Sequence, residues 1–339
     1  MILLIHHRLH PNLEGFIHGV KANDIKLMII TPDQKPYDGL TSSKGEFIHK
    51  QIAQITFSYA FKLFKSYNFS NIIYRHNIKG HYWILLMSYF FGVKIIEYDQ
   101  STHRNDNIFK QSIRPIVRLF QLRPLKKWTP VNFKHSTGKK YIEPFSFFVR
   151  IPMLPIKNIN KTNIVTNKIM MIGKLSESRK NHLRFIEELY SLNAQLIIVG
   201  STPHGFSSEP IYYNLLQSQT KKYKNISLIK NASRKEVFEL YSKVDIFVMP
   251  SSQESLGYSV LEAMSMGCVV VCNKDVGASC YIDDKINGFI FDINKKGDLE
   301  NIVRNLIKYN LDEISLNAQN TINLSNSIST VKEILNIGT

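Results

Sequence analysis

Short apolar runs alternate with longer segments of helical spacing along this chain, and this alternation limits the fold more than any other feature of the sequence. In the first half we expect buried strands at residues 1–5, 26–31, 71–74 and 93–97. Between them lie a loop and helix over 6–23, a helix over 45–67 and a helix over 81–91. Strands that alternate with helices form parallel sheets covered by helices, so the sequence predicts an α/β fold.

The alternation restarts after a stretch with little periodicity. Residues 151–168 are rich in Pro, Asn, Lys and Thr, and we place an interdomain linker there. Further strands are expected at 169–172, 195–199, 226–229, 245–249 and 269–272, with helical segments between them. The sequence therefore predicts a first domain over 1–155, a second over 166–310 and closing helices over 311–339. Whether those helices return to the first domain is left open.

The formal net charge of +16 belongs to the first half of the chain. Residues 1–165 hold 24 Lys and Arg against 9 Asp and Glu, whereas residues 166–339 hold 19 against 18. Such asymmetry indicates an acidic partner for the first half, which could be nucleic acid, an anionic membrane surface or a phosphate-bearing substrate.

The apolar run over 82–93 is too short to span a bilayer, and residues 1–5 are too short for a signal-peptide core. The three cysteines lack metal-ligand spacing and fit a reducing cytosol.

The loop after the expected strand at 245–249 has the composition of a ligand site. In open α/β sheets, ligands bind beyond the carboxyl ends of the strands. This loop reads PSSQESLGYS and places Glu254 there, before a helix that contains Glu262 and ends near Gly267. The first amides of that helix, around Ser255, Leu256 and Gly257, have no intrahelical acceptor and suit a diphosphate.

Pro250, Ser251, Glu254, Gly257, Glu262 and Gly267 together resemble the motif of glycosyltransferase family 4, also called the glycosyl transferases group 1. The resemblance covers most of residues 169–292. It implies a GT-B fold, with two facing Rossmann-like domains, parallel sheets and a cleft between them. The first domain would bind the acceptor and the second the nucleotide sugar. By the same resemblance, Glu254 meets hydroxyls of the donor sugar and Glu262 meets the ribose.

A second block, MMIGKLSESRKNH, resembles the family segment whose cations reach the donor diphosphate. Gly173 and Lys174 fit it. Lysine stands in place of the usual arginine, so the charge is kept but the bidentate contact of a guanidinium is lost. The second cation is either Arg179, by spacing, or Lys180, by its Lys-Asn-His context. Asn231 falls where the family has a base-binding loop, although a glycine is expected there. A solvated basic turn is the alternative interpretation of this block.

The first half offers weaker candidates. The family often has a glycine-rich loop after its first strand, whereas this chain has only Gly15 in HHRLHPNLEG. The three histidines of that segment could contact donor or acceptor, or lie in solvent. Relatives often place a histidine near the reactive carbon after the strand at 93–97. Here Asp99 has the better position and His103 is the alternative, so both are candidate catalytic residues.

The resemblance also implies chemistry without a metal or other cofactor. No Asp-x-Asp sequence is present, which disfavours metal-held diphosphate. Cations and helix amides would then stabilise the leaving diphosphate of a UDP- or GDP-sugar. The expected activity is retaining transfer of a hexose-type sugar to a saccharide or lipid-linked saccharide in bacterial surface polysaccharide synthesis. The chain offers no well-placed nucleophile, so we favour a front-face reaction.

Basic and apolar residues are interleaved over 112–128, which suits a segment lying on an anionic membrane surface. A partly buried helix is an equally good interpretation. We expect a cytoplasmic protein, peripheral to the inner face of the cell membrane if its acceptor is a lipid.

A sugar-nucleotide epimerase or a phosphorylase of the same fold is the nearest alternative to a glycosyltransferase. Nucleic-acid binding is disfavoured because no zinc spacing, RNP motif or recognition helix is present.

Overall fold

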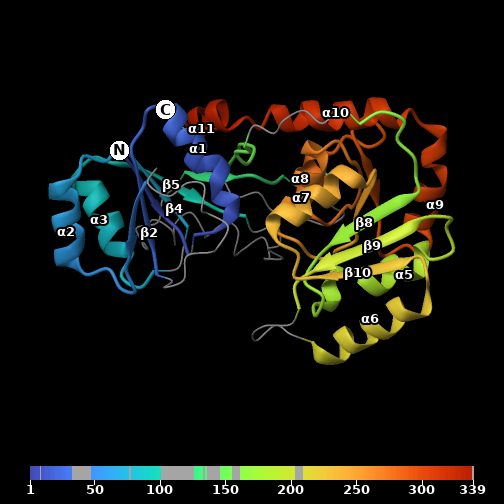
Figure 1. Cartoon of the computed structure of the whole chain (residues 1–339). Helices are drawn as coiled ribbons and strands as arrows, with labels where there is room; N and C mark the ends of the chain where they lie inside the picture. The colour runs from blue at the N-terminus through green and yellow to red at the C-terminus, as the bar shows by residue number, and fades with distance from the viewer. Residues whose placement is uncertain are drawn as a thin grey trace, which may run out of the picture. The chain divides into compact units, whose positions relative to one another are not determined.

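The computed structural model describes residues 1–7, 9–32, 47–75, 78–100, 126–132, 134–135, 146–154, 161–202 and 209–337. The chain divides into two compact units. The first unit comprises residues 1–132, 139–155 and 324–339, and the second comprises 133–138 and 156–323. Each unit has its own parallel sheet (Figure 1).

The first unit is built on a sheet with the strand order β3–β2–β1–β4–β5–β6–β7, and all paired strands are parallel. The central strand β1 has four fully apolar, buried residues because helices cover both of its faces. The strands are β1 (Ile2–Ile5), β2 (Leu27–Thr31), β3 (Ile48–Gln51), β4 (Asn71–Tyr74), β5 (Lys94–Tyr98), β6 (Lys127–Thr129) and β7 (Ser146–Phe148).

Two pairs of helices cover this sheet. Helices α2 (Phe57–Ser66) and α3 (Tyr82–Phe90) pack together on one side, and α1 (Glu14–Ala22) packs with α11 (Ser327–Leu335) on the other (Figure 1). A short 3₁₀ helix, Pro11–Leu13, precedes α1. The contact between α1 and α11 is close: a Cβ on Gly19 would lie 2.2 Å from the carbonyl oxygen of Ser327. The end of the chain therefore completes the first unit.

The second unit contains a sheet with the strand order β10–β9–β8–β11–β12–β13, again parallel. Its strands are β8 (Lys168–Ile172), β9 (Gln195–Gly200), β10 (Ile226–Lys230), β11 (Ile246–Met249), β12 (Val269–Asn273) and β13 (Phe289–Phe291). Its helices are α5 (His182–Leu189), α6 (Pro210–Lys222), α7 (Arg234–Lys243), α8 (Tyr258–Ser265), α9 (Asp298–Asn305) and α10 (Leu311–Asn323). Figure 1 shows α5 and α6 on one side of the sheet and α7 and α8 on the other. The remaining helical turns are 3₁₀: Ser178–Lys180, Gly277–Tyr281 and Leu306–Lys308.

The sequence expectations differ from the structure in several elements. The helix expected over 45–67 is wrong at its start, because β3 occupies Ile48–Gln51 and α2 begins only after Thr56, whose hydroxyl caps the amide of Tyr59. Strands β6, β7 and β13 were not expected. The closing segment is broken between α10 and α11, where the side chain of Asn326 caps the second helix. Along the described parts of the chain, no helix is long and apolar enough to cross a membrane.

Candidate active site

The order of the second sheet directs attention to one position. The chain runs outward from β8 through β9 and β10, and then returns to place β11 on the other side of β8. At such a reversal the loops after the two neighbouring strands diverge to opposite faces and leave a crevice for a ligand. The loops concerned are those after β8 and β11, which carry both motifs found in the sequence.

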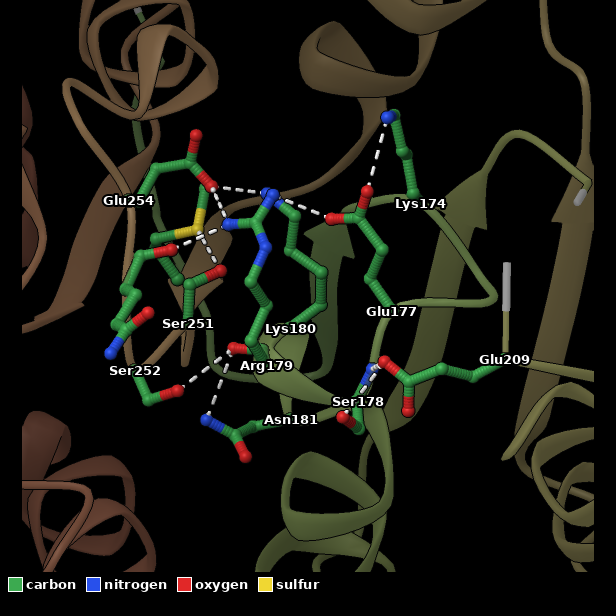
Figure 2. Close-up of polar contacts among 12 residues, drawn as sticks. Lys174, Glu177, Ser178, Arg179, Lys180, Asn181, Glu209, Ser251, Ser252 and Glu254 are labelled. Atoms are coloured by element: carbon green, nitrogen blue, oxygen red, sulfur yellow. Dashed lines mark hydrogen bonds and ion pairs between the residues drawn. The ribbon is translucent and has the colours of Figure 1, made fainter. Parts of the chain in front are cut away.

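Hydrogen bonds tie these two loops together. The amide of Ser252 donates to the carbonyl oxygen of Arg179 at 2.9 Å, and the side chain of Asn181 donates to the carbonyl oxygen of Pro250 at 2.8 Å. Figure 2 shows the side chains of Ser252 and Asn181 directed at the carbonyl oxygen of Arg179. Asn181 adopts a left-handed conformation with φ of 57°, which asparagine tolerates better than most residues. The bend at Asn181 ends the 3₁₀ turn and starts α5, so the cations of this turn are held against the second loop.

Glycines allow the backbone to approach closely at this site. A Cβ on Gly200, at the end of β9, would lie 1.8 Å from the carbonyl oxygen of Gly173. A Cβ on Gly173 would lie only 3.2 Å from the side chain of Lys180. Packing therefore requires glycine at position 200. At position 173 a Cβ would require the Lys180 side chain to shift by only a few tenths of an ångström.

Three cations and two carboxylates form a connected cluster in the second unit (Figure 2). Lys180 forms an ion pair with Glu254, and Arg179 lies 3.2 Å from the same carboxylate. Arg179 also lies 2.5 Å from Glu177, which is 3.0 Å from Lys174. The side chains differ in exposure: Lys180 is 10% exposed, Arg179 40% and Lys174 58%. Lys180 is therefore the cation in the driest surroundings.

Sequence reasoning missed Glu177, which organises the cations. Its side chain is 7% exposed, and burial alone would raise its pKa. The hydrogen bond from Lys174 and the charge of Arg179 outweigh burial and hold the pKa of Glu177 below its ordinary value. The available signal was a carboxylate placed between basic residues in the stretch KLSESRKN. Glu177 stays ionised and fixes two of the predicted phosphate ligands.

Glu254 lies in a turn that a second loop supports. Its carbonyl oxygen accepts the amide of Gly277 at 3.0 Å, and its backbone forms a bridge with Val276. Leu256 likewise accepts the amide of Ala278. The turn ends at Gly257, whose φ of 78° favours glycine and where a Cβ would lie 2.7 Å from the side chain of Val276, and α8 begins at the next residue. The segment Ser255–Gly257 thus brings the amino end of α8 beside Glu254.

Glu262 has different neighbours. It lies in α8 with its side chain 13% exposed, and its carboxylate is 3.5 Å from the guanidinium of Arg234. The two glutamates of the motif therefore meet different cations. Asn231, at the end of β10, has φ of 54° and binds the amide of Thr202 through its side chain at 2.9 Å. This conformation explains how asparagine replaces the glycine expected there.

The first unit contains a cavity of about 140 Å³ at the equivalent reversal of its own sheet, between β1 and β4. His6, His7 and His10 line it together with Arg75, which is 3.1 Å from Nε2 of His6. A guanidinium can only donate, so Nε2 of His6 accepts this hydrogen bond. Two aromatic rings also line the cavity: Tyr98 stacks on Trp128 with centroids 4.2 Å apart, and Arg75 lies over Tyr98.

The remaining candidates of the first unit are placed less favourably. Asp99 forms a 2.6 Å ion pair with Lys127, which is 4% exposed. Lys127, at the end of the basic segment 112–128, is therefore buried in β6 and does not face solvent. Gly15 lies inside α1, where a Cβ would be 2.0 Å from the carbonyl oxygen of Pro152, so packing accounts for it. His103 and residues 112–125 lie outside the described residues.

In the described parts of both units, no group of three or more His, Cys, Asp or Glu side chains is arranged to hold a metal ion. The polar groups that do converge are the cations and carboxylates around Glu254 and the histidines around Arg75. Such a set binds and orients anions and hydroxyls.

Comparison with known proteins gives one family. Residues 155–321 match the model of the glycosyl transferases group 1. An Escherichia coli UDP-Gal:alpha-D-GlcNAc-diphosphoundecaprenol alpha-1,3-galactosyltransferase is 22% identical over 305 residues, covering 81% of this chain and 75% of that protein. The Staphylococcus aureus capsular polysaccharide glycosyltransferase CapM is 29% identical over 121 residues, covering 36% of this chain and 30% of CapM.

Two solved structures resemble the whole chain. A glycosyltransferase from Rickettsia africae superposes with a TM-score of 0.73 at 18% identity and covers 99% of this chain and 98% of its own. Anabaena Alr3699/HepE, solved with UDP and glucose, gives a TM-score of 0.72 at 15% identity with coverages of 98% and 97%. With its two parallel-sheet α/β units, the chain has the GT-B fold.

Proposed function

Because this chain belongs, through residues 155–321, to the glycosyl transferases group 1, we propose that it transfers a hexose-type sugar from a UDP- or GDP-sugar with retention of configuration. The acceptor is a saccharide or a lipid-linked saccharide of bacterial surface polysaccharide synthesis, reached from the cytoplasmic side of the membrane. The observation that carries the proposal is the cluster of Lys180, Arg179 and Glu254 at the sheet reversal of the second unit.

Donor binding exchanges the partners within this cluster. The diphosphate binds the ammonium of Lys180 and the guanidinium of Arg179, the two cations that pair with Glu254 in this structure. Glu254 then accepts hydrogen bonds from hydroxyls of the donor sugar, and Glu262 accepts them from the ribose. The cost of separating Lys180 from Glu254 is offset because the diphosphate offers two charges at the amino end of α8. Glu254 thereby holds the sugar, and Lys180 and Arg179 hold the diphosphate, on the two sides of the bond that breaks.

The reaction that fits these residues is a front-face displacement. The bond between the anomeric carbon and the diphosphate oxygen breaks, and the acceptor oxygen bonds to that carbon on the same face. The acceptor proton passes to the departing phosphate oxygen, so charge and atoms balance. Lys180 and Arg179 stabilise the negative charge that develops on the diphosphate, which is the catalytic contribution expected of fixed cations in a dry site. No metal takes part in this scheme.

The cavity of the first unit suits the acceptor. The histidines and Arg75 that line it provide groups able to hydrogen-bond with saccharide hydroxyls. Arg75 supplies a charge for a phosphate attached to the saccharide, as in the lipid diphosphate named in the Escherichia coli relative. A saccharide presented on a lipid diphosphate should therefore show a lower KM than the same free saccharide.

The experiment that tests the function uses a panel of UDP- and GDP-sugars. Thermal shift identifies nucleotides that stabilise the protein, and the hits are incubated with saccharide and lipid-linked acceptors. The expected product keeps the anomeric configuration of the donor in its NMR spectrum. An inverted product would refute the front-face scheme, and a donor that is only epimerised would establish the alternative enzyme class. No stabilisation by any nucleotide sugar would refute the proposal itself.

A further inference from the structure

Helices α2 and α3 of the first unit expose an unusual number of aromatic side chains. We define the aromatic face by its six exposed rings, Phe57, Phe61, Tyr82, Tyr89, Phe90 and Phe91. Tyr89 is 82% exposed and Phe90 is 69% exposed. Single exposed apolar residues are normal on a soluble protein, but a contiguous group marks a contact surface.

Ring contacts join the two helices into one surface. Phe57 meets Trp83 edge-on across the helix pair at 5.2 Å and stacks on Phe61 at 6.1 Å. At the other end, Phe64 of α2 contacts Phe91 at 5.4 Å, directly after α3. The aromatic face therefore runs along both helices, on the side of the sheet opposite α1 and α11 (Figure 1).

The charge around this face has one sign. Residues 47–96 contain no Asp or Glu, whereas they contain Lys50, Lys62, Lys65, Arg75, Lys79 and Lys94. Lys62 and Lys65 are exposed on α2, and the ammonium of Lys65 lies 4.8 Å from the centre of the Phe61 ring. An interleaved aromatic and cationic surface is complementary to anionic headgroups above an apolar layer.

We propose that the aromatic face docks the protein on an anionic lipid bilayer, with the rings inserted at headgroup depth and Lys62 and Lys65 against phosphate. A second copy of the chain is a poorer occupant, because this acid-free segment would place lysines against lysines in a symmetric contact. Both helices are short, nine and ten residues, so the contact is interfacial. The proposal does not depend on the donor chemistry, but it would bring the proposed transferase to a lipid-linked acceptor.

Vesicle sedimentation of the full chain tests the proposal. The protein should bind vesicles of phosphatidylcholine with phosphatidylglycerol and not vesicles of phosphatidylcholine alone. The double variant Lys62→Gln/Lys65→Gln should lower the partition coefficient by roughly 30-fold. The double variant Tyr89→Ser/Phe90→Ser should lower it by on the order of tenfold, because insertion of the rings is lost.

A matched control removes equally exposed apolar groups elsewhere. Ile211 and Ile307 of the second unit are 86% and 77% exposed, and Ile211→Ser/Ile307→Ser should bind vesicles like the unchanged protein. All variants alter exposed positions, so their thermal unfolding and nucleotide binding should be unchanged. Equal binding by the aromatic variant and the control would overturn the proposal. The proposal would also be overturned if the unchanged protein self-associated without lipid and Tyr89→Ser/Phe90→Ser abolished that association.

Tryptophan fluorescence locates the contact independently. Trp83 and Trp128 are the two tryptophans of the chain, and Trp128 is buried in β6. Brominated phosphatidylglycerol should quench the emission of Trp83, and Trp83→Phe should remove the quenching. Quenching that persists in Trp83→Phe would place the membrane contact elsewhere and refute the proposal. If the unchanged protein binds no nucleotide, that result counts against the transferase function and not against membrane docking.

Discussion

Replacing Lys180 with methionine should weaken donor binding far more than replacing Arg179 with methionine. Methionine keeps most of the apolar stem that passes Gly173, so the change removes mainly the charge. The Lys180 side chain is 10% exposed, whereas that of Arg179 is 40% exposed. A hydrogen bond to a charged group in dry surroundings contributes about 1.5–3 kcal/mol, and an exposed ion pair contributes about 1 kcal/mol or less.

These energies correspond to a loss of about 10- to 150-fold in affinity for Lys180→Met and of about fivefold for Arg179→Met. Calorimetric titration of UDP measures the affinities, and kcat/KM for the nucleotide sugar should fall in parallel. Because Lys180 also pairs with Glu254, each variant needs a melting temperature to show that it is folded. A folded Arg179→Met that lost more affinity than Lys180→Met would refute the assignment of Lys180 as the main phosphate ligand.

Further substitutions probe other parts of the second unit. Glu262→Ala should raise the Kd for UDP about tenfold, the loss of one or two hydrogen bonds to ribose, with a smaller change in kcat; an unchanged Kd would exclude a ribose contact. Gly200→Ala should lower the free energy of unfolding by about 2 kcal/mol or more in urea titrations, because its Cβ would lie 1.8 Å from the oxygen of Gly173. Burial lowers the pKa of His182 to about 4, so the unfolded chain binds more protons below pH 6.5. Stability should therefore fall by up to about 3 kcal/mol as the pH drops from 6.5 to 4, and His182→Gln should show a shallower decline in denaturant titrations.

The parts of the fold that the sequence predicts well are buried on all sides. Strands β8 and β11 are almost entirely apolar and lie between helical segments, so composition alone marks them. Strand β3 lies at the sheet edge and has only one partly buried residue, hence no apolar run reveals it. The break after α10 depends on a distant contact, in which the amide of Met153 donates to Ser325. Local pattern cannot contain that information.

The site follows the same rule. The loop with Glu254 and Gly257 was predictable because the motif requires glutamate at the first position and the positive φ requires glycine at the second. Glu177 was not, since its role depends on two cations that approach it only in the folded turn. Lys127 reads as a surface charge in the sequence, but β6 and its ion pair with Asp99 bury it. Pairing between charges is a tertiary property, and residue type does not show it.

The most direct test compares turnover and nucleotide affinity in Glu254→Gln. Glutamine keeps the shape of the side chain but removes the charge that pairs with Lys180 and that we propose orients donor hydroxyls. With the nucleotide sugar that gives the largest thermal shift, kcat should fall by about 100-fold or more, while the Kd for UDP changes less than about fivefold. Full turnover in this folded variant would contradict the assignment of Glu254 to the reacting sugar, and with it the central claim about this site.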